Sequence, residues 1–189
     1  MSTTKIMLVR HAEKPVGNIA GVGPDGTANA EDLIVQGWQR AGALIGLFDP
    51  PPGKGCRTAL ATPQHLFAAG VGKHSESLRP EHTIAPLSAK LGIETDTQYL
   101  KGDEDKLAAA AMAAGGVVLV SWEHQNIPKI AEAILPKGPY PRHWPEGRFD
   151  VVWVFDRTAS GAGWAFSQVP QLLLAGDQQG VIPLDAGEH

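Results

Sequence analysis

Short apolar runs alternate along the chain with segments that have helical periodicity. Ile6 to Val9 are four consecutive apolar residues, and polar residues and Pro15 follow them closely. Runs of this kind fit strands that are buried on both faces of a parallel sheet. The predicted strands are residues 5–10, 65–69, 117–122, 149–155 and 164–169.

Between the predicted strands, apolar residues recur every three or four positions. Residues 34–48 carry such a stripe, and the breaker Asp49-Pro50-Pro51-Pro52-Gly53 ends it. A second helix must either begin near Pro86 or bend there, and Gly92 ends it. This periodicity therefore predicts helices that alternate with the first strands.

Two further helices are indicated by their ends. Asp103-Glu104-Asp105 opens an alanine-rich segment, where acidic residues suit the helix dipole, and Gly115-Gly116 closes it. Asn126 is a candidate N-cap for a helix that continues to Pro136. The order of elements predicts an α/β fold, a three-layer α/β/α sandwich with a mostly parallel central sheet. With 189 residues, the chain fits a single domain over residues 1–189.

Composition narrows the possible functions. Cys56 is the only cysteine, so no intrachain disulfide and no cysteine-based zinc site can form. The net charge of −4 argues against a nucleic-acid partner, and no apolar segment is long enough for a membrane helix. We therefore expect a soluble, cytoplasmic protein that must capture any anionic substrate with a local cluster of positive charge.

Basic side chains follow the predicted strands where such a cluster is needed. Arg10 and His11 end the first strand, and His124 lies just beyond the strand at residues 117–122. Arg79 lies at a loop-to-helix junction after another strand. Ligands of α/β sheets bind outside the carboxyl ends of the strands, so these four side chains can meet in one crevice. Guanidinium groups bind phosphate oxygens in bidentate fashion, which predicts a phosphate site.

Four segments, in this order, resemble the histidine phosphatase superfamily, also called the phosphoglycerate mutase-like family. Leu8-Val9-Arg10-His11-Ala12-Glu13 is similar to its Arg-His-Gly-Glu signature, and Gly37-Trp38-Gln39-Arg40-Ala41 to its first helix. Ser77-Leu78-Arg79-Pro80-Glu81-His82-Thr83 is similar to the element that carries the second arginine. Val120-Ser121-Trp122-Glu123-His124 is similar to the strand end that carries the second histidine. The resemblance spans about residues 5 to 135.

The resemblance implies a phosphatase that needs no metal and no cofactor. His11 would attack phosphorus and form a phosphohistidine, while Arg10, Arg79 and His124 stabilise the charge on the phosphoryl oxygens. The substrate would be a phosphorylated small molecule or a phosphoprotein. Two alternatives remain open: phosphoglycerate mutase activity, and a non-catalytic phosphate-binding or regulatory domain.

The sequence departs from the family pattern in two respects. Ala12 stands where the family has glycine, and Gln125 follows the second histidine where one branch has its acidic proton donor. The candidates for a catalytic acid or an orienting carboxylate are Glu13, Glu104 and Glu123, of which Glu13 is expected mainly to orient an arginine.

Two further sets of basic residues are candidates near the site. Lys14 is a candidate substrate-binding residue. Arg142, His143 and Arg148, together with Trp144, either line the mouth of the pocket or belong to a solvated loop. The sequence leaves the substrate and the oligomeric state open.

Overall fold

The computed structural model describes residues 4–159, 161 and 163–184, and these residues are built around one six-stranded sheet. The strands lie in the order β3-β2-β4-β1-β5-β6. β1, β2, β3 and β4 run parallel, whereas β5 runs antiparallel to β1 and β6 antiparallel to β5. The strands are β1 (Lys5–Arg10), β2 (His65–Ala68), β3 (Thr95–Asp96), β4 (Val117–Trp122), β5 (Val151–Arg157) and β6 (Trp164–Pro170).

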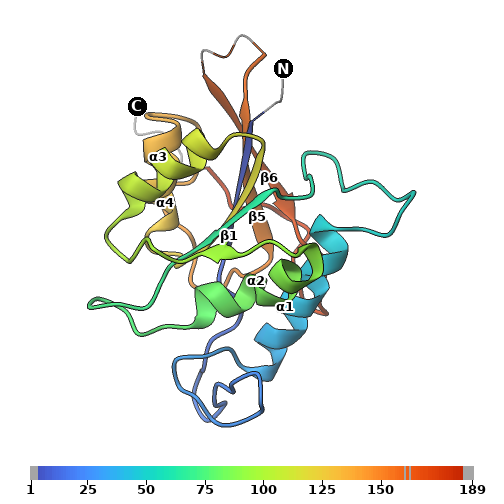
Figure 1. Ribbon diagram of the computed structural model, residues 1–189, viewed down its shortest axis with the longest axis vertical. Coiled ribbons are helices and arrows are strands. Elements are labelled where there is room, and N and C mark those ends of the chain that lie inside the picture. Colours follow the sequence, from blue (N-terminus) through green and yellow to red (C-terminus); the bar gives the residue numbers. More distant parts are fainter. Residues whose placement is uncertain (1–3, 160, 162, 185–189) are drawn as a thin grey trace.

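Helices cover both faces of the sheet, as predicted. They are α1 (Val35–Phe48), α2 (Arg79–Leu91), α3 (Glu104–Ala114) and α4 (Ile127–Ile134). Figure 1 shows α3 and α4 on one side of the central strands and α1 and α2 on the other. The predicted three-layer α/β sandwich with a mostly parallel sheet is confirmed.

The two apolar cores follow from the alternation of side chains along the central strands. Ile6 and Leu8 point from β1 into the core with α3 and α4, whereas Met7 and Val9 point into the core with α1 and α2. All four side chains are fully buried. A strand that is apolar on both faces fits only the middle of a sandwich, which explains the uninterrupted apolar run of β1.

The structure settles the open question about the second helix. α2 begins at Arg79, Pro80 lies in its first turn, and the helix continues through Pro86 to Leu91. Proline costs an interior helix a hydrogen bond, but Ile84 and Leu87 are fully buried on either side of Pro86. Their burial against the sheet offsets that loss. Gly92 ends the helix in the left-handed region, with φ of 66°.

Two predictions about local structure need correction, and one strand was not predicted. Asn126 occupies the N-cap position of α4 but makes no side-chain cap, because its amide donates to the Glu123 carboxylate instead. The strand predicted at residues 149–155 spans Val151–Arg157 instead, and the Asp150 carboxylate just before it accepts from the Arg148 side chain and the Gln178 amide. β3 was not predicted, since two partly buried residues carry no periodic signal.

Within the described residues, no helix is both long and apolar enough to cross a membrane.

Candidate active site

The pairing of β1 with β4 brings the two histidines to one edge of the sheet. Arg10 lies opposite Trp122 in the parallel register, and the His11 amide donates to the Trp122 carbonyl at 2.9 Å. His124 follows two residues later. The β1–β4 register therefore brings Arg10, His11 and His124 together outside the carboxyl ends of these adjacent strands, as predicted.

His11 is held as a neutral imidazole. Its side chain is 5% exposed, and its Nδ1 lies 2.8 Å from the Ala12 carbonyl oxygen. A carbonyl can only accept, so Nδ1 carries the proton and Nε2 keeps its lone pair. Burial, with smaller contributions from the nearby Arg10, Arg79 and His124, lowers the pKa of His11 to about 3. A neutral histidine with a free Nε2 is the form that can attack phosphorus.

Arg10 is fully buried at the end of β1. Its Nη1 donates to the carbonyls of Glu146 and, at 3.1 Å, Arg148, and its guanidinium lies 3.8 Å from the centre of the Phe149 ring. Burial lowers the pKa of Arg10 to about 10, so the group is still charged at neutral pH. Nε and Nη2 are also buried but have no hydrogen-bond partner among the described residues. A charged donor of this kind is stable only where an acceptor can approach it.

Arg79 and His124 present similar donors. Arg79 begins α2, and its Nη1 donates to the Ala30 carbonyl at 3.1 Å, but its buried Nε has no partner in the described part of the chain. The same holds for the buried Nδ1 of His124. Burial, with smaller contributions from Arg10 and Lys14, lowers the pKa of His124 to about 4. The cluster therefore offers two arginines and a neutral histidine around His11.

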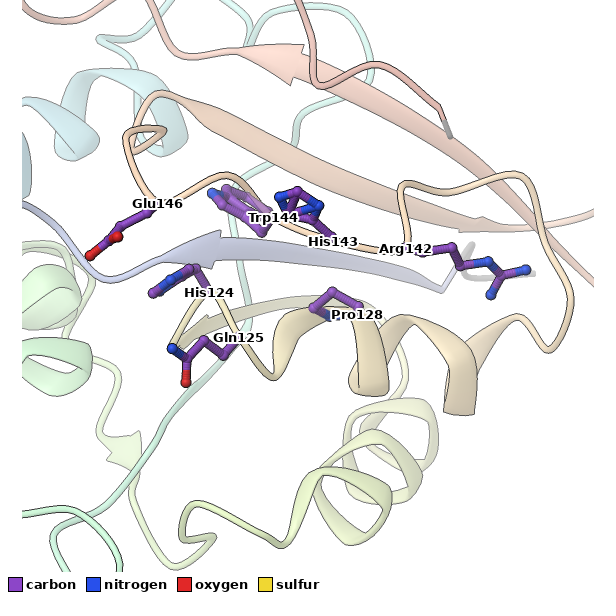
Figure 2. A pocket seen from close by; sticks show the side chains of 7 residues that line it. All are labelled: His124, Gln125, Pro128, Arg142, His143, Trp144 and Glu146. Atoms are coloured by element: carbon purple, nitrogen blue, oxygen red, sulfur yellow. The ribbon is translucent and has the colours of Figure 1, made fainter. Parts of the chain in front are cut away.

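Two hollows adjoin this cluster. The smaller one, with about 50 Å³ of free space, contains the nucleophile candidate and is lined by His11, Ala69, Ser75, Ser77, Arg79, Pro80, Lys101 and Glu123. The larger one has about 320 Å³ and borders His124. Figure 2 shows it between the loop around residues 142–146 and the start of α4, with His124 and Glu146 at one end and Arg142 at the other. Arg142, His143 and Trp144 of the predicted stretch thus line this larger hollow, whereas Arg148 is buried and pairs with Asp150 at 2.7 Å.

The peptide after His11 is fixed by α2. The Ala12 amide donates to Thr83 Oγ1 at 2.7 Å, and the same hydroxyl donates to the Arg79 carbonyl at 2.7 Å. Thr83 is 1% exposed, so water cannot replace these bonds. Ala12 is not among the described residues with positive φ, so alanine causes no backbone strain in the place of the family's glycine.

The Glu13 carboxylate is part of a buried ionic network. Its carboxylate pairs with Arg40 of α1 at 2.8 Å, and Arg40 also pairs with Asp177 at 2.7 Å. Glu13 therefore contacts an arginine, Arg40, which is not one of the two arginines of the proposed site. Gly37 lets α1 approach, because a Cβ there would lie 2.7 Å from the Glu13 carbonyl oxygen. The α1 motif thus supports the loop that follows His11.

The other predicted carboxylates and Lys14 lie in different surroundings. Glu104 is 4% exposed and accepts from Trp122 Nε1 at 3.1 Å, which makes it a core residue. Glu123 lines the smaller hollow with His11 and pairs with Lys101 at 3.0 Å. Lys14 pairs with the exposed Glu146 at 2.9 Å, near His124. Of the three acid candidates, only Glu123 is therefore exposed to the same space as His11.

Several residues of the site were not predicted from the sequence. Lys101 lies in a turn outside the four segments that resemble the family, so no sequence motif indicated it. Ser75, which lines the smaller hollow, lies four residues before Arg79. The family element that carries the second arginine has a serine at this spacing, so the sequence could have indicated Ser75. Phe149 was taken as a strand residue rather than as the ring beneath Arg10. In the described part of the chain, no group of three or more histidine, cysteine, aspartate or glutamate side chains could hold a metal ion.

Solved structures with the same fold are phosphatases by name. The protein histidine phosphatase SixA, determined with tungstate, is 13% identical, covers 88% of this chain and 97% of its own, and gives a TM-score of 0.53. The ecdysone phosphate phosphatase of Bombix mori, also with tungstate, is 14% identical over 98% and 97%, with a TM-score of 0.53. A mycobacterial glucosyl-3-phosphoglycerate phosphatase is 12% identical over 87% and 97%, with a TM-score of 0.51.

The sequence itself matches no protein-family model and no curated protein. At identities of 12–14% the structural likeness concerns the fold, and this chain has the histidine phosphatase fold that its motifs predicted.

Proposed function

We propose that this protein is a phosphomonoesterase that acts through a phosphohistidine on His11. One observation carries the proposal: a neutral histidine with a free Nε2 lies among buried donors of Arg10, Arg79 and His124 that have no protein partner in the described chain. Such donors match the three equatorial oxygens of a phosphoryl group, whose charge they stabilise during in-line transfer.

In the proposed reaction, Nε2 of His11 attacks phosphorus while the bond between phosphorus and the oxygen of the leaving group breaks, and the electron pair of that bond stays on the oxygen. The Ala12 carbonyl, which accepts from Nδ1, stabilises the positive charge that develops on the ring. Water then attacks the phosphohistidine and releases phosphate. The two arginines supply the positive charge that a metal supplies in other phosphoryl-transfer enzymes, so the reaction needs no metal.

The two hollows suggest where the parts of the substrate lie. Free space of about 50 Å³ beside His11 is enough for a phosphoryl group, whereas the hollow of about 320 Å³ beyond His124 can hold the rest of a small molecule. Ligand pockets usually measure roughly 300–1,000 Å³, so a small phosphate ester suits this site. Two proteins with a similar fold, SixA and the ecdysone phosphate phosphatase, were determined in complex with tungstate, which supports oxyanion binding by this fold.

The test is hydrolysis of p-nitrophenyl phosphate by the wild type and by His11→Ala, each with and without EDTA. We expect steady release of phosphate by the wild type in both buffers, inhibition by tungstate, and loss of activity in His11→Ala. Equally negligible rates in both proteins would refute the enzymatic function. Release of phosphate from 3-phosphoglycerate without isomerisation is the result expected of a phosphatase rather than a mutase.

A further inference from the structure

Glu123 shares a small hollow with the nucleophile candidate His11. It lines the same small hollow as His11 and Arg79, and it is the residue before His124. Its side chain is 21% exposed, so it is neither locked in the core nor free in solvent. Glutamate residues elsewhere near the site have other partners, as described above for Glu13 and Glu104.

Two neighbours fix the Glu123 carboxylate. Lys101 Nζ lies 3.0 Å from Oε2, and the Asn126 amide donates to Oε1. Lys101 also lines the hollow, and the turn that carries it precedes α3. The carboxylate is therefore held by one residue from that turn and one from the start of α4, which is the preorganisation that proton transfer requires.

We propose that Glu123 is the residue that transfers protons in this site and that Lys101 positions it. This inference rests on the proposed phosphatase function. In hydrolysis of the phosphoenzyme, the water oxygen bonds to phosphorus while the bond between phosphorus and His11 Nε2 breaks and its electron pair returns to Nε2. The proton lost by the water goes to Glu123. In the next turnover Glu123 gives that proton to the oxygen of the leaving group as its bond to phosphorus breaks.

The ion pair with Lys101 suits the first of these roles. The Lys101 ammonium group holds Oε2, and the carboxylate lies beside the hollow that contains His11, where it can accept a proton from the attacking water. Glu146, the other carboxylate near His124, is 74% exposed in its side chain and pairs with Lys14 on the side of the larger hollow. Glu123 is therefore the better placed of the two for a reaction centred on His11.

The experiment compares Glu123→Gln with wild type on two substrates, p-nitrophenyl phosphate and an alkyl phosphate, by rapid mixing and phosphoenzyme trapping. p-Nitrophenolate leaves without a proton. The variant should therefore still release one equivalent of p-nitrophenolate per active site rapidly and then accumulate phosphohistidine. Loss of a general base slows a step by about 10²–10⁴-fold, and we expect phosphoenzyme hydrolysis to slow within that range. The alkyl phosphate, whose leaving group needs a proton, should also form phosphoenzyme more slowly. Added formate should restore part of the hydrolysis rate in Glu123→Ala.

The controls separate a catalytic role from a structural one. Glu132→Gln makes the same chemical change on an exposed position of α4 and should leave all rates unchanged. A phosphoenzyme that forms and breaks down in Glu123→Gln at the wild-type rate would overturn the inference while leaving the phosphatase function intact. The same effects found in Glu146→Gln instead would also overturn it. Failure of the wild type to form any phosphoenzyme would refute the proposed function itself.

Discussion

Replacing Thr83 by valine tests how the nucleophile's loop is held. Valine keeps the shape of threonine but removes the hydroxyl that accepts from the Ala12 amide and donates to the Arg79 carbonyl, both at 2.7 Å. Ala12 and Thr83 are almost completely buried, so the Ala12 N–H would be left without a partner. An unsatisfied buried donor costs about 1–3 kcal/mol, and we expect the free energy of unfolding to fall by that amount.

The same change should reduce catalysis, since Ala12 supplies the carbonyl that fixes the tautomer of His11. Urea denaturation measures the first effect and the kcat for p-nitrophenyl phosphate the second. Thr83→Ser is the matched control. Serine keeps the hydroxyl, so this variant should retain most of the free energy of unfolding and most of the kcat. Unchanged stability in Thr83→Val would refute the argument that this hydrogen bond anchors the loop.

Three further predictions concern the supports of the site and its charge state. Arg40→Leu leaves two buried carboxylates without their counter-ion, so unfolding should become easier by about 3–5 kcal/mol in urea; a change below about 1 kcal/mol would contradict the role of this network. Gly37→Ala should destabilise the protein, because its Cβ would lie 2.7 Å from a backbone oxygen. Gly42→Ala on the same helix, where a Cβ meets no atom within 4 Å, should stabilise it by about 0.5–1 kcal/mol. Thermal melts that rank the two variants in the opposite order would refute this. The lowered pKa values of His11 and His124, about 3 and 4 against an ordinary 6.5, mean that the unfolded chain binds protons below pH 6.5 that the folded chain does not. The free energy of unfolding should therefore fall as the pH falls from 6.5 toward 4, and ring signals of His11 that titrate near pH 6.5 in NMR spectra would contradict this.

Much of the fold could be predicted because its determinants are local. The apolar runs of β1 and β4 and the ends of α3 were apparent from neighbouring residues alone, and the carboxyl-end rule then placed Arg10, His11 and His124 together. The antiparallel direction of β5 and β6 could not be predicted, since a buried strand has the same apolar pattern in either direction. The start of α2 was ambiguous for a related reason: tertiary burial of Ile84 and Leu87 decides whether the helix tolerates Pro86.

The basic residues of the site were predicted better than its carboxylates. Arg10 and Arg79 stand at ends of elements, where sequence position determines placement. Glu13, Glu104 and Glu123 could not be ranked, because their roles depend on partners far away in the sequence: Arg40, Trp122 and Lys101, respectively. Glu13 and Glu123 are each next to or near a histidine in sequence, yet only the contacts of the folded chain distinguish the structural carboxylate from the one that faces His11.

The most direct measurement is the identification of the covalent intermediate. Enzyme mixed with p-nitrophenyl phosphate should be quenched in alkali, in which phosphohistidine survives, digested, and analysed by mass spectrometry. The account predicts one phosphorylated histidine, on the peptide that contains His11, formed and lost at rates compatible with turnover. Phosphate on another residue, or steady turnover without any phosphohistidine, would contradict it.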